Sequence, residues 1–304
     1  MSALLEVENL EKRFNGKTVV DRVSFSVGKG QVMGMLGPNG AGKTTIIRMI
    51  MGVFAPDSGQ IRVALDGTVD SKLDKRRIGY LPEERGLYQD ARVIDLLVFV
   101  AGLKGVDKAT AYKKAINWLE KWDLSDNAKS KVDQLSKGMR QKVQFIASVI
   151  HEPDFIVLDE PLSGLDPVNQ DLFRQEIQLL VEQGRTILLS SHQMSLVEET
   201  CDKIFLINRG RKVVYGNLKE IKEEYGHYQV KITAPAGMEK IEQLPVVESV
   251  VQNFDNWLFT LKQGVSPGEF LTLLPKDIPY EELTVTMISL HDIFIKAVKG
   301  VAEA

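Results

Sequence analysis

Cysteine is almost absent from this chain of 304 residues, which contains one, Cys201. A single thiol excludes an internal disulfide and is typical of proteins from a reducing compartment. Long hydrophobic runs are also missing, since the longest, Leu96–Leu103, is far shorter than the ~20 residues that a membrane-spanning helix requires. If this protein acts at a membrane, another chain must therefore span it. The charged amino terminus is not what we expect of a secretory signal peptide.

Charge of one sign does not dominate this sequence. Its 38 basic and 41 acidic residues give a net charge of −3. This balance supplies no general electrostatic attraction to nucleic acid or to an anionic membrane surface, so we expect no nucleic acid partner. Repeats and low-complexity tracts are also absent, and the length corresponds to about two globular domains.

The most informative motif is the run Gly37–Thr45, with the sequence GPNGAGKTT. It follows an apolar strand-like run, Gln31–Leu36, and precedes a helical run, Thr45–Met51, so it lies where a helix begins. Unpaired backbone N–H groups and the positive end of the helix dipole would then face bound phosphates. We expect Lys43 to bridge the β- and γ-phosphates of a nucleoside triphosphate and the Thr44 hydroxyl to bind Mg²⁺. The residues assigned to the nucleotide in this loop are Gly37, Pro38, Asn39, Gly40, Ala41, Gly42, Lys43, Thr44 and Thr45.

Two adjacent carboxylates, Asp159 and Glu160, end the apolar strand-like run that begins at Phe155. Core packing does not require adjacent acids there, but a magnesium–nucleotide site does, because ligands collect at the carboxyl ends of strands in open α/β sheets. We expect Asp159 to hold Mg²⁺ through its water shell. Glu160 would act as the general base that polarises the attacking water. A solvated acidic turn is the alternative interpretation.

Strand and helix signals divide the chain into two parts. Up to about residue 225, short apolar strands alternate with helices, which predicts a mostly parallel sheet covered on both faces. Two strands around an Asn15–Gly16 turn add an antiparallel β layer. Residues from about 90 to 150 have helical spacing without strand signals, which indicates a helical insertion. We therefore expect a nucleotide-binding α/β domain at 1–225.

The remainder of the chain has a different order of elements. From Tyr228 onward, strand and helix signals follow the order β-α-β-β-α-β, which predicts a small α+β domain with a ferredoxin-like fold. We expect this accessory domain to span 226–304. Its sequence contains no clustered histidine, cysteine or acidic ligands. A ligand sensor and a dimer-stabilising appendage are both open interpretations of its role.

Further motifs resemble those of the ABC-type ATPases, in the order in which that family has them. Leu135–Met139 (LSKGM) resembles the LSGGQ signature, and Ser163–Asp166 resembles the D-loop. His192, at the end of a strand, resembles the switch histidine that contacts the γ-phosphate. Phe14 falls where the family has an aromatic residue that stacks on adenine. The resemblance covers residues 3 to about 220 and implies a P-loop NTPase fold of the ABC type, with ATP and Mg²⁺ as cofactors.

The signature has a physical role of its own. Ser136 and Gly138 precede a helical run, so a hydroxyl and bare backbone amides face a second anion site at a helix amino terminus. In the family, the phosphate loop of one subunit and the signature of another clamp each ATP between them. One chain carries one of each. The resemblance therefore implies a second ATP-binding subunit, either an identical copy or a paralogue.

A histidine on an apolar strand is usually a core residue. His192 follows Ser190–Ser191 and comes after the acidic pair, and this position favours a contact with the γ-phosphate instead. The catalytic residues assigned from the sequence are Glu160 and His192.

The chain departs from the family pattern in two motifs. Within Tyr80–Tyr88, which resembles the Q-loop, Glu83 stands where most members have glutamine. A carboxylate binds Mg²⁺ more strongly than an amide, so Glu83 is assigned to the metal with Thr44 and Asp159, although it adds a negative charge near the γ-phosphate. In the signature, Lys137 replaces a glycine and could reach a phosphate. The serine and the second glycine of the signature remain, so we expect activity to survive.

The Glu83 form of the Q-loop and the appended domain together resemble one branch of the family. Its members are ATP-binding subunits of bacterial export-type ABC transporters, including sodium-extrusion ATPases. The resemblance implies an ATPase in the cytoplasm, peripheral on the inner face of the cell membrane through a separate permease. A soluble ABC-type ATPase acting on DNA or ribosomes usually has a coiled-coil insertion or tandem ATPase halves, which this chain lacks. A GTP switch would need an Asn-Lys-x-Asp motif, which is also absent.

Overall fold

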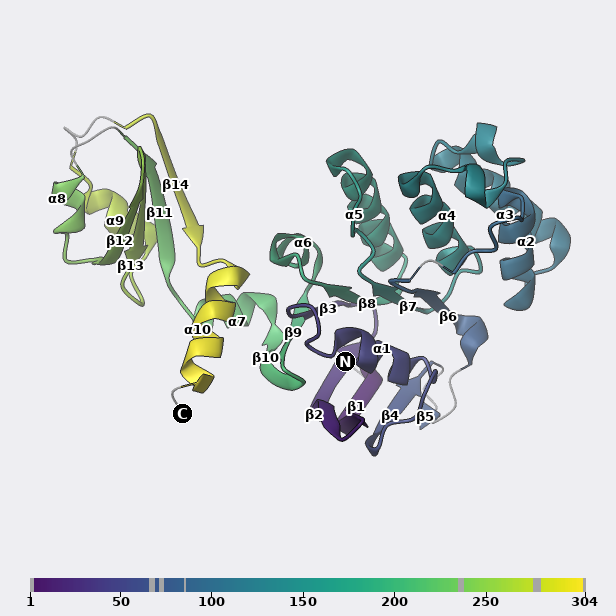
Figure 1. Cartoon of the computed structure of the whole chain (residues 1–304). Coiled ribbons are helices and arrows are strands. Elements are labelled where there is room, and N and C mark those ends of the chain that lie inside the picture. The colour runs from purple at the N-terminus through teal and green to yellow at the C-terminus, as the bar shows by residue number, and fades with distance from the viewer. Residues whose placement is uncertain are drawn as a thin grey trace. The chain divides into compact units, whose positions relative to one another are not determined.

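The computed structural model describes residues 3–65, 69–70, 74–84, 86–234, 238–275 and 280–302. They form two compact units, Met1–Tyr215 and Gly216–Ala304, whose elements are labelled in Figure 1. The division lies before the position expected from the sequence, because helix α7 (Leu218–Glu224) groups with the second unit.

A six-stranded sheet with the order β10-β9-β3-β8-β7-β6 forms the centre of the first unit (Figure 1). Strand β3 pairs in parallel with β8 and β9, and β7 pairs in parallel with β6 and β8. Every residue of β3, β7 and β8 is buried, as continuous apolar runs predict for a parallel sheet covered on both faces. The strands are β3 (Val32–Leu36), β6 (Ile78–Leu81), β7 (Phe155–Asp159), β8 (Thr186–Ser191), β9 (Lys203–Asn208) and β10 (Arg211–Asn217).

Helices α5 and α6 cover one face of this sheet, and α1 with an antiparallel sheet covers the other (Figure 1). Helix α6 contacts β3, where a Cβ on Gly34 would lie 2.9 Å from the buried Sγ of Cys201. Only glycine therefore fits there. The helices are α1 (Lys43–Ile50), α5 (Pro167–Glu182) and α6 (Met194–Thr200).

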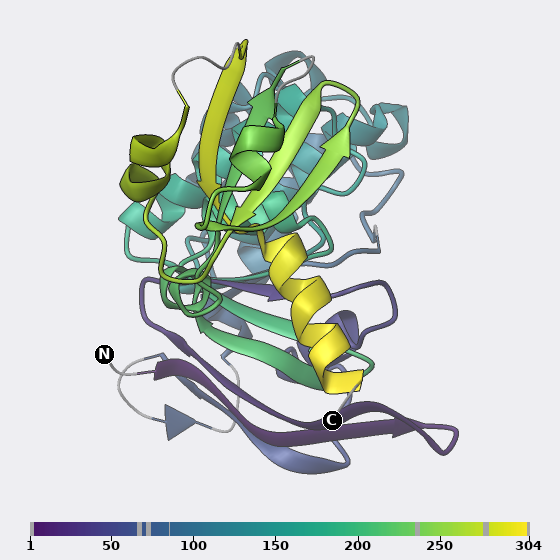
Figure 2. The same cartoon turned by 90° about the vertical axis from the view of Figure 1, so that its left-hand side faces the viewer.

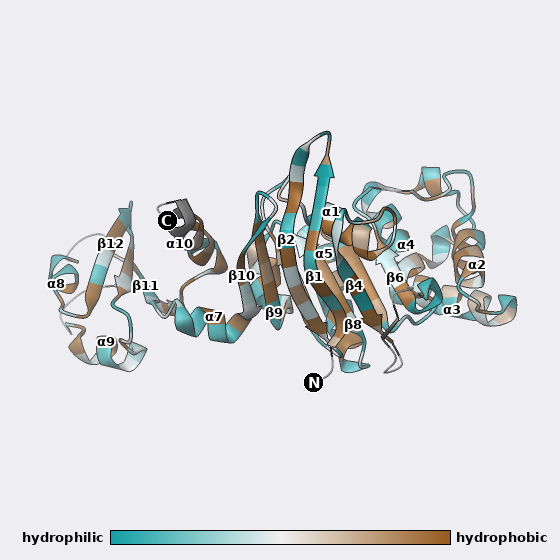
Figure 3. Ribbon diagram, turned by 90° about the horizontal axis from the view of Figure 1, so that it is seen from below, coloured by the Kyte–Doolittle hydropathy of each residue, from teal (hydrophilic) through white to brown (hydrophobic). Residues whose placement is uncertain are grey.

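The antiparallel sheet has the order β2-β1-β4-β5. Its first hairpin turns at Asn15 and Gly16, whose φ angles of 49° and 78° suit the tight turn expected there. Hydrophilic and hydrophobic residues alternate along β1 and β2 (Figure 3), so one face of the sheet is buried. The strands are β1 (Ala3–Phe14), β2 (Lys17–Gly28), β4 (Ser58–Ala64) and β5 (Val69–Asp70).

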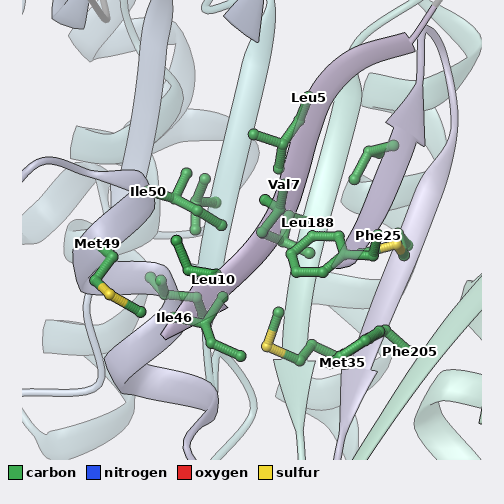
Figure 4. Packing of buried hydrophobic residues seen from close by; sticks show 14 of the residues in the cluster. Leu5, Val7, Leu10, Phe25, Met35, Ile46, Met49, Ile50, Leu188 and Phe205 are labelled. Carbon is green, nitrogen blue, oxygen red and sulfur yellow. The ribbon is translucent and has the colours of Figure 1, made fainter. Parts of the chain in front are cut away.

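A hydrophobic core fills the space between the antiparallel sheet, α1 and the six-stranded sheet. Figure 4 shows Leu5 and Leu10 of β1 together with Ile46 of α1, Met35 of β3 and Phe205 of β9. All five side chains are fully buried, and each contributes about 1.5–3 kcal/mol of hydrophobic stabilisation. Because Met35 precedes the loop Gly37–Thr45 and Ile46 follows it, this core fixes both ends of the loop.

The expected helical insertion is present, with three helices. Trp122 stacks on Phe145 at 4.9 Å and 14°, and both rings contact Phe173 of α5. The buried carboxylate of Glu176 on α5 pairs with Lys121 at 2.6 Å. These contacts attach the insertion to α5. The helices are α2 (Val93–Leu103), α3 (Lys108–Lys121) and α4 (Lys137–Val149), with 3-10 turns at Ser125–Asn127 and Val132–Gln134. Another 3-10 turn, Lys75–Arg77, lies outside the insertion and precedes β6.

The second unit contains a four-stranded antiparallel sheet with the order β12-β13-β11-β14. This order and the β-α-β-β-α-β sequence of elements are those of the ferredoxin-like fold, as predicted. Helices α8 and α9 lie on one face of the sheet (Figure 2). The elements are β11 (Tyr228–Thr233), α8 (Glu239–Glu242), β12 (Val247–Asn253), β13 (Asn256–Leu261), α9 (Pro267–Leu273), β14 (Glu282–Met287) and α10 (Leu290–Ala302).

Candidate functional site

The loop Gly37–Thr45 joins the end of β3 to the start of α1, where the sequence predicted it. Gly40 and Gly42 have φ angles of 76° and 110°, which glycine adopts without strain. A Cβ on Gly42 would lie 2.9 Å from the Val19 carbonyl oxygen. The loop can therefore curl tightly against β2 only with glycine at this position.

The loop forms one wall of a cavity of about 340 Å³. This volume falls in the range of small-molecule sites. Gly37 and Pro38, which the sequence assigns to the nucleotide, are not among the residues that line the cavity. Val19 lines it without having been predicted, because an apolar residue in a strand carries no signal of such a role. The lining residues are Val19, Asn39, Gly40, Ala41, Gly42, Lys43, Thr44, Thr45, Glu83 and Glu160.

Lys43 is folded back onto the loop. Its Nζ donates a hydrogen bond to the Gly37 carbonyl oxygen at 2.8 Å and lies 3.4 Å from Glu160 Oε1. Only 6% of the Lys43 side chain and 8% of the Glu160 side chain are exposed. A buried charge is stable only with such a partner, so the ammonium and the carboxylate hold each other in place.

Glu160 also contacts the predicted histidine. His192 Nδ1 lies 2.8 Å from Glu160 Oε2, so Lys43 and His192 hold opposite oxygens of one carboxylate. The backbone of Glu160 has a φ of 50°, a conformation that costs a non-glycine residue free energy and is common at functional sites. Its N–H donates to Ser190 Oγ at 3.0 Å, which anchors the end of β7 to β8.

The three residues assigned to the metal come together beside the loop. Thr44 Oγ1 lies 3.3 Å from Glu83 Oε2 and 3.4 Å from Asp159 Oδ1. Asp159 is 1% exposed, and burial is the main cause that raises its pKa. Hydrogen bonds from Ser190 and Thr44 oppose this shift, whereas the negative charge of Glu83 adds to it.

The signature residues lie elsewhere in the first unit, beside the D-loop. Ser136 is the N-cap of α4, and its Oγ accepts a hydrogen bond from the Met139 N–H at 3.2 Å. A Cβ on Gly138 would lie 3.7 Å from Asn169 Nδ2 at the start of α5. Neither Ser136 nor Gly138 lines the cavity at the phosphate loop.

Lys137 also contacts the D-loop. Its Nζ lies so close to Gly164, whose φ is 73°, that a Cβ at this position would clash with it. The sequence alone suggested a phosphate as the target of this lysine. In the structure its side chain connects the signature with the D-loop of the same chain.

Phe14, assigned to adenine, ends β1 and is 43% exposed. Its ring meets the edge of Phe54 at 5.6 Å, and Lys12 Nζ lies 5.6 Å and 5.5 Å from the two ring centroids. Asp57 fixes Lys12 at 2.7 Å. The Phe14 side chain is thus partly exposed, although it does not line the cavity at the phosphate loop.

A second cavity, of about 360 Å³, lies between α2, α4 and the loop after β6, and we call it the α2 groove. None of its described lining residues is acidic. Lys104 at its edge donates to the Ile78 carbonyl oxygen at 3.0 Å, and burial lowers the pKa of this lysine. Sequence reasoning missed the groove. Its lining includes Val53, Lys75, Leu87, Val100, Lys104 and His151.

Aromatic and aliphatic side chains on and beside α2 are exposed. Tyr88 is 64%, Phe99 49% and Leu103 66% exposed. Helix α2 is almost entirely hydrophobic, as Figure 3 shows. In the described ranges, the structure has no helix that is long and apolar enough to cross a membrane.

Two family models match the chain. The model described as ABC transporter matches residues 20–163, which include the phosphate loop, the signature and the acidic pair. The model described as ATP-binding protein DrrA1-3-like, C-terminal domain, matches residues 216–298. The second match begins where the second unit begins.

Individual relatives agree with these matches. The uncharacterized ABC transporter ATP-binding protein YhaQ of Bacillus subtilis is 37% identical over 300 residues, which cover 99% of this chain and 100% of the relative. The Nod factor export ATP-binding protein I of Ralstonia nicotianae is 39% identical, over 72% of this chain and 68% of the relative. A solved structure of an ATP-binding subunit of an ABC transporter has a TM-score of 0.67 and 30% identity, over 73% of this chain and 93% of that chain.

Proposed function

Because this chain belongs to the ABC transporter ATP-binding proteins, which hydrolyse ATP, we propose that it drives a separate membrane-spanning permease by dimerising around ATP. The observation that carries the proposal is the position of Glu160 between Lys43 and His192 at the wall of the phosphate-loop cavity. An acid held in this way beside a phosphate-binding loop suits the activation of water.

Each residue of the site has a distinct role in the proposed reaction. The loop amides and Lys43 bind the phosphates, and Phe14 stacks on the base. Glu160 accepts a proton from the attacking water, and His192 orients the Glu160 carboxylate through the contact of 2.8 Å.

Mg²⁺ fits the oxygen ligands beside the loop. Thr44, Asp159 and Glu83 would hold it, and the buried Asp159 Oδ2, which has no hydrogen-bond partner among the described residues, is an orphan oxygen of the kind that a cation satisfies. When bound, the ion would neutralise charge on the β- and γ-phosphates.

A second subunit completes the site in this proposal. Ser136 and Gly138 lie at the D-loop and not at the cavity, so they are available to the ATP held by another copy or by a paralogue. The helix amino terminus that Ser136 caps favours phosphate. ATP would thus join two subunits, and hydrolysis would release them.

The α2 groove is our candidate for the permease contact. It is flanked by the exposed apolar side chains of Tyr88, Phe99 and Leu103, and Lys75 and Lys104 line it without an acidic neighbour among the described lining residues. These features suit an amphipathic cytoplasmic segment that carries a carboxylate. Export is the direction that we propose, supported by the similarity to the Nod factor export protein. The chain would then lie in the cytoplasm, at the inner face of the membrane.

Replacement of Glu160 tests the catalytic proposal. Glu160→Gln keeps the shape of the side chain and removes its charge, so we expect ATP binding and dimers to persist while ATP turnover falls roughly 10²–10⁴-fold. Nucleotide binding, gel filtration with ATP and phosphate release measure the three properties. Glu120→Gln, an exposed change on α3, is the control. Normal turnover in Glu160→Gln would reject the assignment of the base.

Co-purification with a candidate permease tests the partner. Phe99→Asp on α2 should abolish co-purification while ATP binding stays normal, because a charge would enter the apolar contact. Tyr112→Asp, on the exposed side of α3, should have no effect. Equal recovery of the permease with both variants would exclude the α2 groove as the contact.

A further inference from the structure

We propose that the phosphate-loop region of this chain binds a divalent cation before any nucleotide arrives, with Glu83 as the ligand that makes this possible. The inference rests on the proposed function, because it concerns the metal of the same site. It goes beyond the proposed function because side chains alone must bind the metal, without the phosphate oxygens of a nucleotide.

The geometry places one hydroxyl oxygen close to two carboxylates. Thr44 Oγ1 lies within 3.3 Å of Glu83 Oε2 and 3.4 Å of Asp159 Oδ1. The three side chains come from different elements, namely α1, the loop after β6 and the end of β7. The cores around α1 and β7 fix two of the three ligands. Hydroxyl and carboxylate oxygens are the donors that Mg²⁺ and Mn²⁺ prefer.

The charges nearby leave these carboxylates without a cationic partner. Lys43, the nearest basic residue in the cavity, pairs with Glu160 at 3.4 Å. Arg48 pairs with Glu84 at 3.1 Å. In the part of the chain that the structure describes, no basic side chain forms an ion pair with Glu83 or Asp159. The site thus holds two carboxylates that no basic side chain of the described residues pairs with, as a site for a cation requires.

The burial of Asp159 adds an independent observation. This residue is 1% exposed, and its Oδ2 is buried without a hydrogen-bond partner among the described residues. An orphaned carboxylate oxygen in a protein interior costs free energy unless a cation or a donor satisfies it. The unpartnered oxygen of Asp159 therefore indicates a bound ligand independently of the position of Glu83.

Glutamine at position 83 would not give the same result. An amide oxygen can still ligate a metal, but it brings no charge, so the site would then hold one net negative charge instead of two. Divalent cation sites are tuned by the number of charged ligands. With glutamine, a stable metal site would depend on the phosphates of the nucleotide. With Glu83, the side chains of the protein supply the second negative charge of the metal site without a nucleotide.

Titration of the nucleotide-free protein with Mn²⁺ tests this inference. Electron paramagnetic resonance measures the concentration of free Mn²⁺ and so gives the affinity. The ratio of nucleotide-base absorbance to aromatic side-chain absorbance establishes beforehand that no nucleotide is bound. We expect one Mn²⁺ per chain, displaced by Mg²⁺, with an affinity about tenfold lower in Glu83→Gln, as the loss of one charged ligand implies. Glu84→Gln, the same chemical change one residue further on, should bind Mn²⁺ as the unaltered chain does.

Two results would overturn the inference. One is equal Mn²⁺ affinity in Glu83→Gln and in the unaltered chain, and the other is no Mn²⁺ binding by the unaltered chain at millimolar concentration. Asp159→Asn provides a second test, since it should also lose the nucleotide-free site. ATP hydrolysis by Glu83→Gln separates this inference from the proposed function: turnover with unchanged Mn²⁺ affinity rejects the inference alone.

Discussion

At the scale of single residues, the unusual feature of this site is the lysine in the signature. Lys137 packs against Gly164 of the D-loop, so closely that a Cβ on this glycine would clash with the lysine side chain. In the proposed dimer, the signature and the D-loop lie at the same ATP. The contact between Lys137 and Gly164 joins these two segments within one chain. The length of the lysine side chain and the bare backbone of the glycine fit each other, so a change at either position should disturb both segments.

Gly164→Ala should lower ATP turnover. The new methyl group would displace Lys137, and a misplaced catalytic segment costs roughly 10- to 100-fold in rate. Gly184→Ala is a matched control, because Gly184 has a similar φ of 83° with no atom within 4 Å of its added Cβ. Both variants should lose about 1 kcal/mol of stability through backbone strain. Phosphate release and urea unfolding distinguish them; equal turnover would contradict the coupling of the two segments.

His151 should make the fold sensitive to acid. Burial, with the nearby charge of Lys104 in support, lowers the pKa of His151 from 6.5 to about 4. Between these values the unfolded chain binds a proton that the folded chain does not, so stability falls as the pH decreases from 6.5 towards 4. His151→Gln should remove roughly 1–2 kcal/mol of that loss.

Urea unfolding at several pH values between 6.5 and 4 measures the effect. His291→Gln, an exposed change at the start of α10, is the control and should keep the acid sensitivity of the unaltered chain. If His151→Gln lost stability with acid as steeply as this control, His151 would not be the group responsible.

At the scale of elements, the helical insertion is attached to the core by one aromatic cluster. Trp122 is fully buried between Phe145 and Phe173. Trp122→Ala would leave a large cavity, and we expect a loss of about 3–5 kcal/mol in the free energy of unfolding. Urea unfolding followed by circular dichroism measures it. Tyr112→Ala, exposed on α3, should lose less than 1 kcal/mol; a similar loss in both variants would contradict the role of the cluster.

The elements that the sequence predicted are those with strong local signals. The strand before Gly37 and the strand that ends at Asp159 have continuous apolar runs, and their carboxyl ends gave the site. Strand β10 was missed, because Arg209, at a φ of 48°, starts a tight turn that sequence rules expect of Asn or Asp. Helix α6 was missed because it has seven residues and no side-chain cap.

Contacts between distant segments could not be predicted in this way. Nothing near Gly164 in the sequence indicates Lys137, and nothing near Lys104 indicates the α2 groove. Such pairs depend on how helices pack, which local patterns do not determine. The family resemblance predicted that Glu83 and Thr44 bind the same metal ion, but only the structure gives the distance between the two side chains.

At the scale of the whole molecule, the proposed dimer makes a prediction about mixed subunits. A chain with Lys43→Ala lacks a working phosphate loop, and a chain with Ser136→Ala lacks a working signature. In a head-to-tail pair of the two, one site carries both defects and the other carries neither. We expect mixed dimers to regain up to about half of the normal ATP turnover, whereas each variant alone should have little.

Affinity-tagged mixed dimers, assayed for phosphate release, test this expectation. A pair in which one chain carries both changes and the other carries none has one defect in each site and should stay inactive. Turnover in that arrangement, or none in the first, would contradict a shared site.

The single thiol gives this molecule a reporter that needs no engineering. Cys201 is 7% exposed and lies behind Gly34, on the strand that leads into the phosphate loop, and burial raises its pKa. An alkylating reagent can reach it only when α6 opens away from β3. The rate of labelling, measured by mass spectrometry with and without ATP, would therefore report how often α6 opens away from β3, the strand that leads into the phosphate loop.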